Sequence, residues 1–320
     1  MSIFSKIEKV YKDTLFSRHD SDGTIFYFSS GDFPGLVREP YSFKTKRGDT
    51  LQGYFYKYDS SVEGRIVVLE HGMGTGHRAY MREIELLARH GYVVFAYDHT
   101  GCTESSGEGI RGFAGSLADL DSAILALKSD SLCKDMKISV VGHSWGGFST
   151  LNILALHPDV SHVIAISGFT SVKRMQAQLV PFFLFPLRRK VFQIESEANP
   201  DYVNFEAEKS LENSTAKALI IHSKDDKTVN ISHFKRLKKK LSYKDNIRFM
   251  LVDGKNHNPN YSYSAVEYLG DFFKTLTDKK RKGELEAPES KSAFIASYDW
   301  WRMTEQDESL WSEIFKTLSE

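Results

Sequence analysis

Short runs rich in valine and isoleucine recur along most of this chain, and amphipathic stretches separate them. Several of the runs are continuously apolar, as expected for strands that are covered on both faces of a sheet. The expected strands are residues 65–72, 92–98, 136–144, 162–168, 217–223 and 247–253. The stretches with helical spacing are residues 80–91, 115–130, 146–157, 231–241 and 264–279. This regular alternation predicts an α/β fold with a mainly parallel central sheet and helices on both faces.

The first sixty residues follow a different pattern. Residues 24–28, 41–45 and 51–58 are aromatic and β-branched, which predicts antiparallel strands. The turn-like segment KRGDT separates the last two runs, so we expect them to form a hairpin.

Two later segments interrupt the alternation. Residues 169–216 separate two strands by more than one crossover requires, which indicates a small cap insertion within a domain of residues 1–280. Residues 281–320 are expected to form a C-terminal helical tail, because residues 307–318 carry one apolar stripe at helical spacing. We expect this tail to pack on the body of the protein or to serve an oligomer interface.

Composition excludes several classes of protein. The 42 lysines and arginines equal the 42 aspartates and glutamates, so no global field favours nucleic acid or an anionic membrane. Cys102 and Cys133 are too few for a disulfide framework and lack metal-ligand spacing. The longest strongly apolar run, residues 179–187, is too short to span a bilayer. With no signal-peptide pattern at residues 1–16, we expect a cytoplasmic protein without a membrane span.

The segment GHSWGG carries the clearest chemical signal. Ser144 lies between Gly142 and Gly146, where an expected strand must turn sharply into an expected helix. A serine at such a turn adopts a strained backbone that lifts its hydroxyl above the sheet. The N–H groups at the start of the following helix favour a developing oxyanion at the same point.

With this motif the chain resembles the α/β-hydrolase superfamily, and the closest resemblance is to the branch of serine aminopeptidases and monoacylglycerol lipases. The resemblance covers about residues 41 to 275. Four further segments carry it: HGMGTGH (71–77), DHTGCTES (98–105), HSKDDKTV (222–229) and GKNHN (254–258). Thr103 and Ser223 stand where the family usually has glycine. The resemblance implies a serine hydrolase that uses a Ser-His-Asp triad.

The resemblance assigns the remaining members of the site. His257 follows the last strand and is the expected base, while the acid is expected in the loop after strand 217–223. That loop holds Asp225 and Asp226; the spacing to Val229 favours Asp226, and Asp225 would then hold the turn. The chain order of serine, acid and histidine is the one expected of this superfamily. The expected oxyanion donors are the backbone N–H groups of Met73 and Trp145.

The substrate is expected to be a small ester with an apolar acyl group, and no cofactor or metal is expected. Phe182, Phe183 and Phe185 of the cap are the candidate substrate-binding residues, because apolar aromatic side chains line most small-molecule sites. Packing of the cap on the sheet is the alternative role for these three residues. For the protein as a whole, an aminopeptidase, thioesterase or acyltransferase with the same triad and a catalytically silent binding protein remain alternatives.

Overall fold

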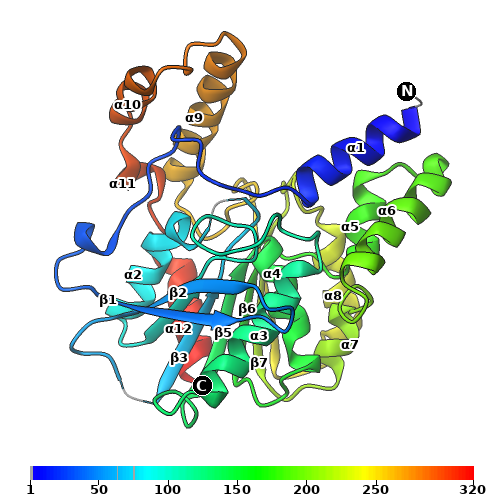
Figure 1. Ribbon diagram of the computed structural model, residues 1–320. Helices are drawn as coiled ribbons and strands as arrows, with labels where there is room; N and C mark the ends of the chain where they lie inside the picture. Colours follow the sequence, from blue (N-terminus) through cyan, green and yellow to red (C-terminus); the bar gives the residue numbers. More distant parts are fainter. Residues whose placement is uncertain (1–2, 63, 75) are drawn as a thin grey trace.

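The computed structural model describes residues 3–62, 64–74 and 76–320 (Figure 1). Its centre is an eight-stranded sheet with the order β1-β2-β4-β3-β5-β6-β7-β8. Strand β2 pairs antiparallel with β1 and β4, and all other neighbours are parallel. The strands are β1 (Val37–Lys44), β2 (Thr50–Lys57), β3 (Arg65–Glu70), β4 (Val93–Tyr97), β5 (Lys137–His143), β6 (His162–Ile166), β7 (Lys217–Ser223) and β8 (Ile247–Val252). The predicted mainly parallel α/β sheet and the predicted hairpin are therefore confirmed.

Helices cover both faces of this sheet. The α-helices are α1 (Ile3–Leu15), α2 (Met81–Arg89), α3 (Gly115–Ser129), α4 (Trp145–Asn152), α5 (Val172–Leu179), α6 (Phe185–Ala198), α7 (Ala207–Glu212), α8 (Ser232–Leu241), α9 (Tyr263–Arg281), α10 (Pro288–Ala296), α11 (Trp300–Met303) and α12 (Glu308–Ser319). The 3₁₀ turns are η1 (Ser30–Asp32), η2 (His77–Tyr80), η3 (Ile153–Ala155) and η4 (Phe182–Leu184).

Alternation along the strands divides the core into two parts. Val68 and Phe95 point into a cluster with α3, α4 and α8, whereas Val67 and Val94 point into a cluster with α2, α9 and α12. Because successive strand residues face opposite sides, a continuously apolar strand supplies both clusters. This explains why the middle of β3 and of β4 is apolar at successive positions.

The segment 24–28, predicted as a strand, does not form one. It runs as irregular chain, with the Phe26 ring 5.9 Å from that of Trp300 and the Phe28 ring 4.7 Å from that of Trp301. Phe26 and Phe28 therefore pack against α11 and not in a sheet ladder. The prediction was wrong because β-propensity measures fit to a half-buried surface, which a helix can also provide.

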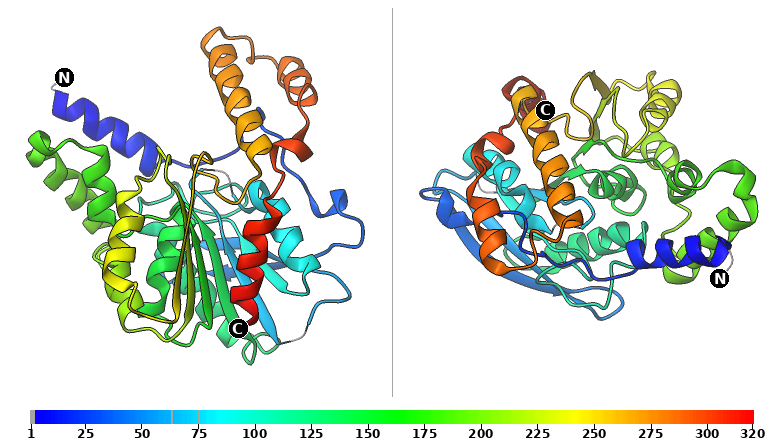
Figure 2. Two further views of the ribbon diagram at one scale, coloured as in Figure 1. Left: turned by 180° about the vertical axis from the view of Figure 1, so that it is seen from behind. Right: turned by 90° about the horizontal axis from the view of Figure 1, so that it is seen from above.

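The region after β8 contains an insertion that sequence analysis did not separate from the sheet helices. Helices α9, α10 and α11 project from the body, and the chain then returns to the sheet as α12 (Figure 2). Leu310, Trp311, Ile314 and Leu318 of α12 are buried in the second core cluster. Residues 281–320 contain α10, α11 and α12, and α12 packs on the body. In the part of the chain that is described, no helix is long and apolar enough to cross a membrane.

Candidate active site

The turn at Ser144 has the strained geometry that its sequence predicts. Ser144 follows β5 with φ 56° and ψ −111°, and α4 begins at the next residue. A Cβ atom at Gly142 would lie 2.4 Å from the carbonyl oxygen of Gly146. A Cβ at Gly146 would lie 2.3 Å from the carbonyl oxygen of Glu70 on β3. Only glycine fits these two positions, so the flanking glycines permit the turn that exposes the serine.

The carboxyl ends of the parallel strands bring the other site segments to the same edge. Asp226 follows β7 and His257 follows β8. His257 Nδ1 donates a hydrogen bond of 2.8 Å to Asp226 Oδ2, while Asp226 Oδ1 accepts from the backbone N–H groups of Thr228 and Val229 at 2.8 and 2.9 Å. Burial alone would raise the pKa of Asp226, but the hydrogen bonds from His257 and from the Val229 N–H lower it overall. The carboxylate is therefore ionised, and it fixes the orientation of the imidazole by accepting the hydrogen bond from Nδ1.

Asp225 takes a different position from its neighbour. Its carboxylate accepts a 2.5 Å hydrogen bond from the Ser223 hydroxyl and a 3.2 Å hydrogen bond from the Asn256 backbone. It thereby ties the loop after β7 to the loop that carries His257, which is the turn-holding role considered for it from the sequence.

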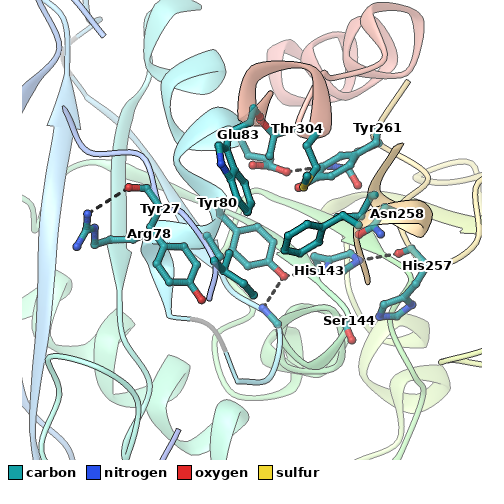
Figure 3. A pocket seen from close by; sticks show the side chains of 18 of the residues that line it. Tyr27, Arg78, Tyr80, Glu83, His143, Ser144, His257, Asn258, Tyr261 and Thr304 are labelled. Atoms are coloured by element: carbon teal, nitrogen blue, oxygen red, sulfur yellow. Dashed lines mark hydrogen bonds between the residues drawn. The ribbon is translucent and has the colours of Figure 1, made fainter. Parts of the chain in front are cut away.

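A hydrogen-bonded chain from Tyr80 connects three loops of the site, and sequence analysis did not detect it. Burial lowers the pKa of His143 to about 3, so its imidazole is neutral. Its Nε2 lies 2.7 Å from the carbonyl oxygen of His257, which can only accept, so Nε2 carries the proton. Nδ1 then accepts from the Tyr80 hydroxyl at 2.8 Å, and that hydroxyl accepts from the Gly72 N–H at 2.9 Å (Figure 3).

These hydrogen bonds join the segment before Met73, the turn at Ser144 and the loop that carries His257. A Cβ at Gly72 would lie 3.6 Å from the Ser144 Cβ, so the 71–73 segment passes directly beside the serine. Trp145 is the first residue of α4, and the first N–H groups of a helix have no partner within it. Its indole is buried in the first core cluster and donates to the Phe113 carbonyl oxygen at 2.7 Å, so the side chain has a packing role.

Ser144, His257 and Met73 line a cavity of about 380 Å³. Figure 3 shows Ser144 and His257 at one side of it and Glu83, Thr304 and Tyr261 at another. Most of the remaining wall is apolar or aromatic: Ile25, Phe26, Tyr27, Phe28, Leu269, Phe272, Phe273, Trp300 and Met303. The irregular segment 24–28 and the α9–α11 insertion therefore supply the wall.

Phe183 and Phe185 of the cap do not contribute to this wall. Phe183 and Phe185 are 72% and 60% exposed at the tip of the cap, and neither is among the residues that line the cavity. The side chain of Phe182 lies outside the described residues. The expectation that Phe183 and Phe185 bind substrate is revised, because residues of the α9–α11 insertion and not these two line the cavity that contains Ser144.

Glu83 of α2 is the acidic group in the cavity wall. Its Oε1 accepts hydrogen bonds from Asn260 at 3.0 Å and Gln306 at 3.2 Å. Burial raises the pKa of Glu83 to about 7, and these hydrogen bonds offset only part of the increase. The wall thus holds a carboxyl group that titrates near neutral pH.

The C-terminal segment supports the histidine loop directly. Lys255 is 1% exposed and forms an ion pair with Asp307, which also donates its backbone N–H to the Asn260 carbonyl oxygen at 2.8 Å. Ser262 donates its backbone N–H to the Glu305 carbonyl oxygen at 2.9 Å. Residues 305–307 therefore hold both ends of the loop that contains His257.

Neither of the two cysteines is an activated thiol. Burial raises the pKa of Cys133 to about 11 and that of Cys102 further, so neither thiol is activated. Within residues 3–62, 64–74 and 76–320, no group of three or more histidine, cysteine or acidic side chains is placed to hold a metal ion.

Comparison with known proteins supports the same fold. Residues 63–204 match the family model described as serine aminopeptidase, S33. An esterase from Pyrococcus furiosus is 18% identical with a TM-score of 0.60, and the alignment covers 84% of this chain and 96% of the esterase. Acetyl xylan esterase 1 from Thermoanaerobacterium is 15% identical with a TM-score of 0.54, and the alignment covers 80% of this chain and 88% of that enzyme.

An acylaminoacyl peptidase from Pyrococcus horikoshii is 17% identical with a TM-score of 0.53 over 70% of this chain and 38% of the peptidase. A search of curated protein sequences finds no match. The protein has the α/β-hydrolase fold and resembles the serine aminopeptidase branch of that superfamily.

Proposed function

We propose that this protein is a serine hydrolase that cleaves carboxylic esters through an acyl-enzyme formed on Ser144. The observation that carries the proposal is the position of a strained serine beside a carboxylate-oriented histidine in one apolar cavity. Two of the structures compared above are esterases, which agrees with this reaction class.

The chemistry follows from the tautomer of His257. Its Nε2 accepts the Ser144 proton while the serine oxygen attacks the ester carbonyl carbon. The backbone N–H groups of Met73 and Trp145 stabilise the negative charge that develops on the carbonyl oxygen. His257 then gives the proton to the departing alcohol, leaving an acyl-serine. Water, deprotonated by the same histidine, attacks this ester and releases the carboxylic acid and Ser144.

The cavity wall supports a preference for apolar acyl groups. Each methylene that moves from water into the wall is worth about 0.8 kcal/mol, or about a four-fold gain in kcat/KM, until the cavity is filled. We expect kcat/KM to rise from acetyl to butyryl and hexanoyl esters and then to fall. A steady decline from acetyl onward would contradict an apolar acyl site.

Substitutions in the acid pair test the triad. Asp226→Asn should lower kcat by orders of magnitude with the fold retained, because His257 loses the acceptor that fixes its tautomer. Asp225→Asn is the matched control, since it changes the adjacent carboxylate, which binds the Ser223 hydroxyl and the Asn256 backbone. A larger loss for Asp225→Asn would overturn the assignment.

Aminopeptidase activity is a second candidate because Glu83 places a carboxyl group in the cavity wall. An ionised Glu83 would attract the free ammonium group of an aminoacyl substrate. We expect aryl esters to be turned over faster than aminoacyl arylamides. If the arylamides are preferred and Glu83→Gln abolishes that preference, the protein is an aminopeptidase.

Thioester hydrolysis and acyl transfer would use the same triad. Turnover of acyl thioesters, and product analysis with an added alcohol acceptor, distinguish them from ester hydrolysis. The same proposal includes a cytoplasmic location, which the two buried free thiols Cys102 and Cys133 support.

A further inference from the structure

The tip of the cap, defined here as residues 179–190, exposes a group of apolar side chains. Leu179 is 50% exposed, Phe183 72% and Phe185 60%. Single exposed apolar residues are ordinary, but three within seven positions form a patch. Helices α5 and α6, which this tip connects, extend beside α1 at one end of the molecule (Figures 1 and 2). The patch is therefore on a projection, where a flat surface can reach it.

The cap tip also has a local excess of positive charge. Residues 172–193 contain five lysines and arginines and no acidic residue, although the whole chain is neutral. Arg174 lies 3.9 Å from Glu208, and Lys173 lies over the ring of Phe192, so these two cations have partners within the protein. The other three, residues 188–190, belong to the cap tip itself.

The three cations of the cap tip lie next to its apolar side chains. Arg188 donates to the carbonyl oxygens of Ala177 and Val180 at 2.7 Å, which holds its guanidinium beside Leu179. Phe185 and Arg189 are four residues apart on α6 and therefore share one face of the helix. Arg189 and Lys190 are both exposed.

We propose that the cap tip docks on an anionic lipid surface. The apolar side chains enter the boundary between headgroups and acyl chains, and the cations contact the lipid phosphates. The positive charge of the cap tip favours a lipid surface over a second copy of the protein. Two copies docked by this face would bring six cations together, whereas an anionic lipid surface neutralises the three cations of one copy. A projecting patch also suits a flat surface better than a peptide, which binds in a groove.

Docking at this place would bring the cavity close to the lipid. Gln178 at the end of α5 donates to the Thr228 carbonyl oxygen at 2.8 Å, and Thr228 lines the cavity. The delivery of lipid-dissolved esters to Ser144 rests on the proposed function, but the docking itself does not.

Vesicle binding of Ser144→Ala protein tests docking without hydrolysis. Vesicles of phosphatidylcholine alone are compared by flotation with vesicles that contain one third phosphatidylserine. We expect binding to the anionic vesicles that weakens with added salt. Arg189→Gln with Lys190→Gln should weaken it about 25-fold, at about five-fold for each charge removed. Phe183→Ser with Phe185→Ser should weaken it about ten-fold or more.

Matched controls lie elsewhere on the surface. Leu132→Ser changes an 81% exposed leucine, and Lys239→Gln with Lys240→Gln removes two exposed cations of α8. Neither control should alter vesicle binding, and none of these variants should change the melting temperature by more than a degree or two. Equal binding to both vesicle types, an equal loss in the controls, or equally tight binding to soluble polyglutamate would overturn the proposal. Loss of esterase activity in Ser144→Ala with vesicle binding retained would leave docking standing on its own.

Discussion

The ion pair between Lys255 and Asp307 offers a measurable link between the C-terminal segment and the active site. The Lys255 side chain is 1% exposed and that of Asp307 is 20% exposed. Asp307→Asn keeps a side-chain acceptor for the first turn of α12, since asparagine also caps helices well. It removes the charge that compensates the buried ammonium of Lys255. The substitution therefore isolates the charge of the pair.

Removing one partner of a buried ion pair costs about 3–5 kcal/mol, because the other charge stays buried and unpaired. The partial exposure of Asp307 places the expected loss at the lower end, at about 3 kcal/mol. For a chain of this size this corresponds to a decrease in melting temperature of about 4–5 °C. The Lys255→Met, Asp307→Asn double variant should recover much of the loss, since no unpaired charge remains.

The assay combines urea unfolding with kcat and KM on an aryl ester. Glu313→Gln is the control: it breaks the ion pair of Arg248 with Glu313, which also joins α12 to the sheet but is about one third exposed and should cost less than about 1 kcal/mol. We expect Asp307→Asn to lower kcat more than it raises KM, because the loop of His257 loses its support. If Asp307→Asn is no more destabilising than Glu313→Gln, the reasoning is refuted.

Three further predictions concern the network, the cap and the cavity. Tyr80→Phe leaves the Gly72 N–H and His143 Nδ1 without their partner, so kcat should fall by up to about 100-fold with little change in KM. An unchanged kcat would exclude a positioning role for Tyr80. Burial raises the pKa of Glu195, on the buried face of α6 in the cap, from 4.5 to about 7, so the stability that its protonated form contributes should be lost as pH rises from about 4.5 through 7. The melting temperature of the wild type minus that of Glu195→Gln should therefore fall over this pH range. A difference that stays constant would contradict a buried carboxyl group with a raised pKa. Phe272→Ala should lower kcat/KM for hexanoyl esters more than for acetyl esters, whereas Phe183→Ala should change neither; the opposite order would restore the cap as the acyl site.

The sequence carries strong signals for some parts of the site and none for others. Ser144, Asp226 and His257 each follow an apolar strand, and parallel strands bring such positions to one edge whatever the loops between them do. The walls of the cavity come from segments 24–28 and 263–304, which are more than 200 residues apart and meet only through tertiary packing. Periodicity cannot reveal contacts of this kind, so the aromatic run at 24–28 was assigned to a strand. Tyr80 gave no signal either, because its role depends on the distances to Gly72 and His143.

Covalent labelling with a fluorophosphonate probe tests the central claim most directly. The probe reacts with a serine only where a base activates the hydroxyl and donors stabilise the oxyanion. Peptide mapping should find one adduct, on Ser144, and Ser144→Ala protein with an unchanged melting temperature should not react. An adduct on another residue, labelling that persists in Ser144→Ala, or an unreactive wild-type protein would contradict the account.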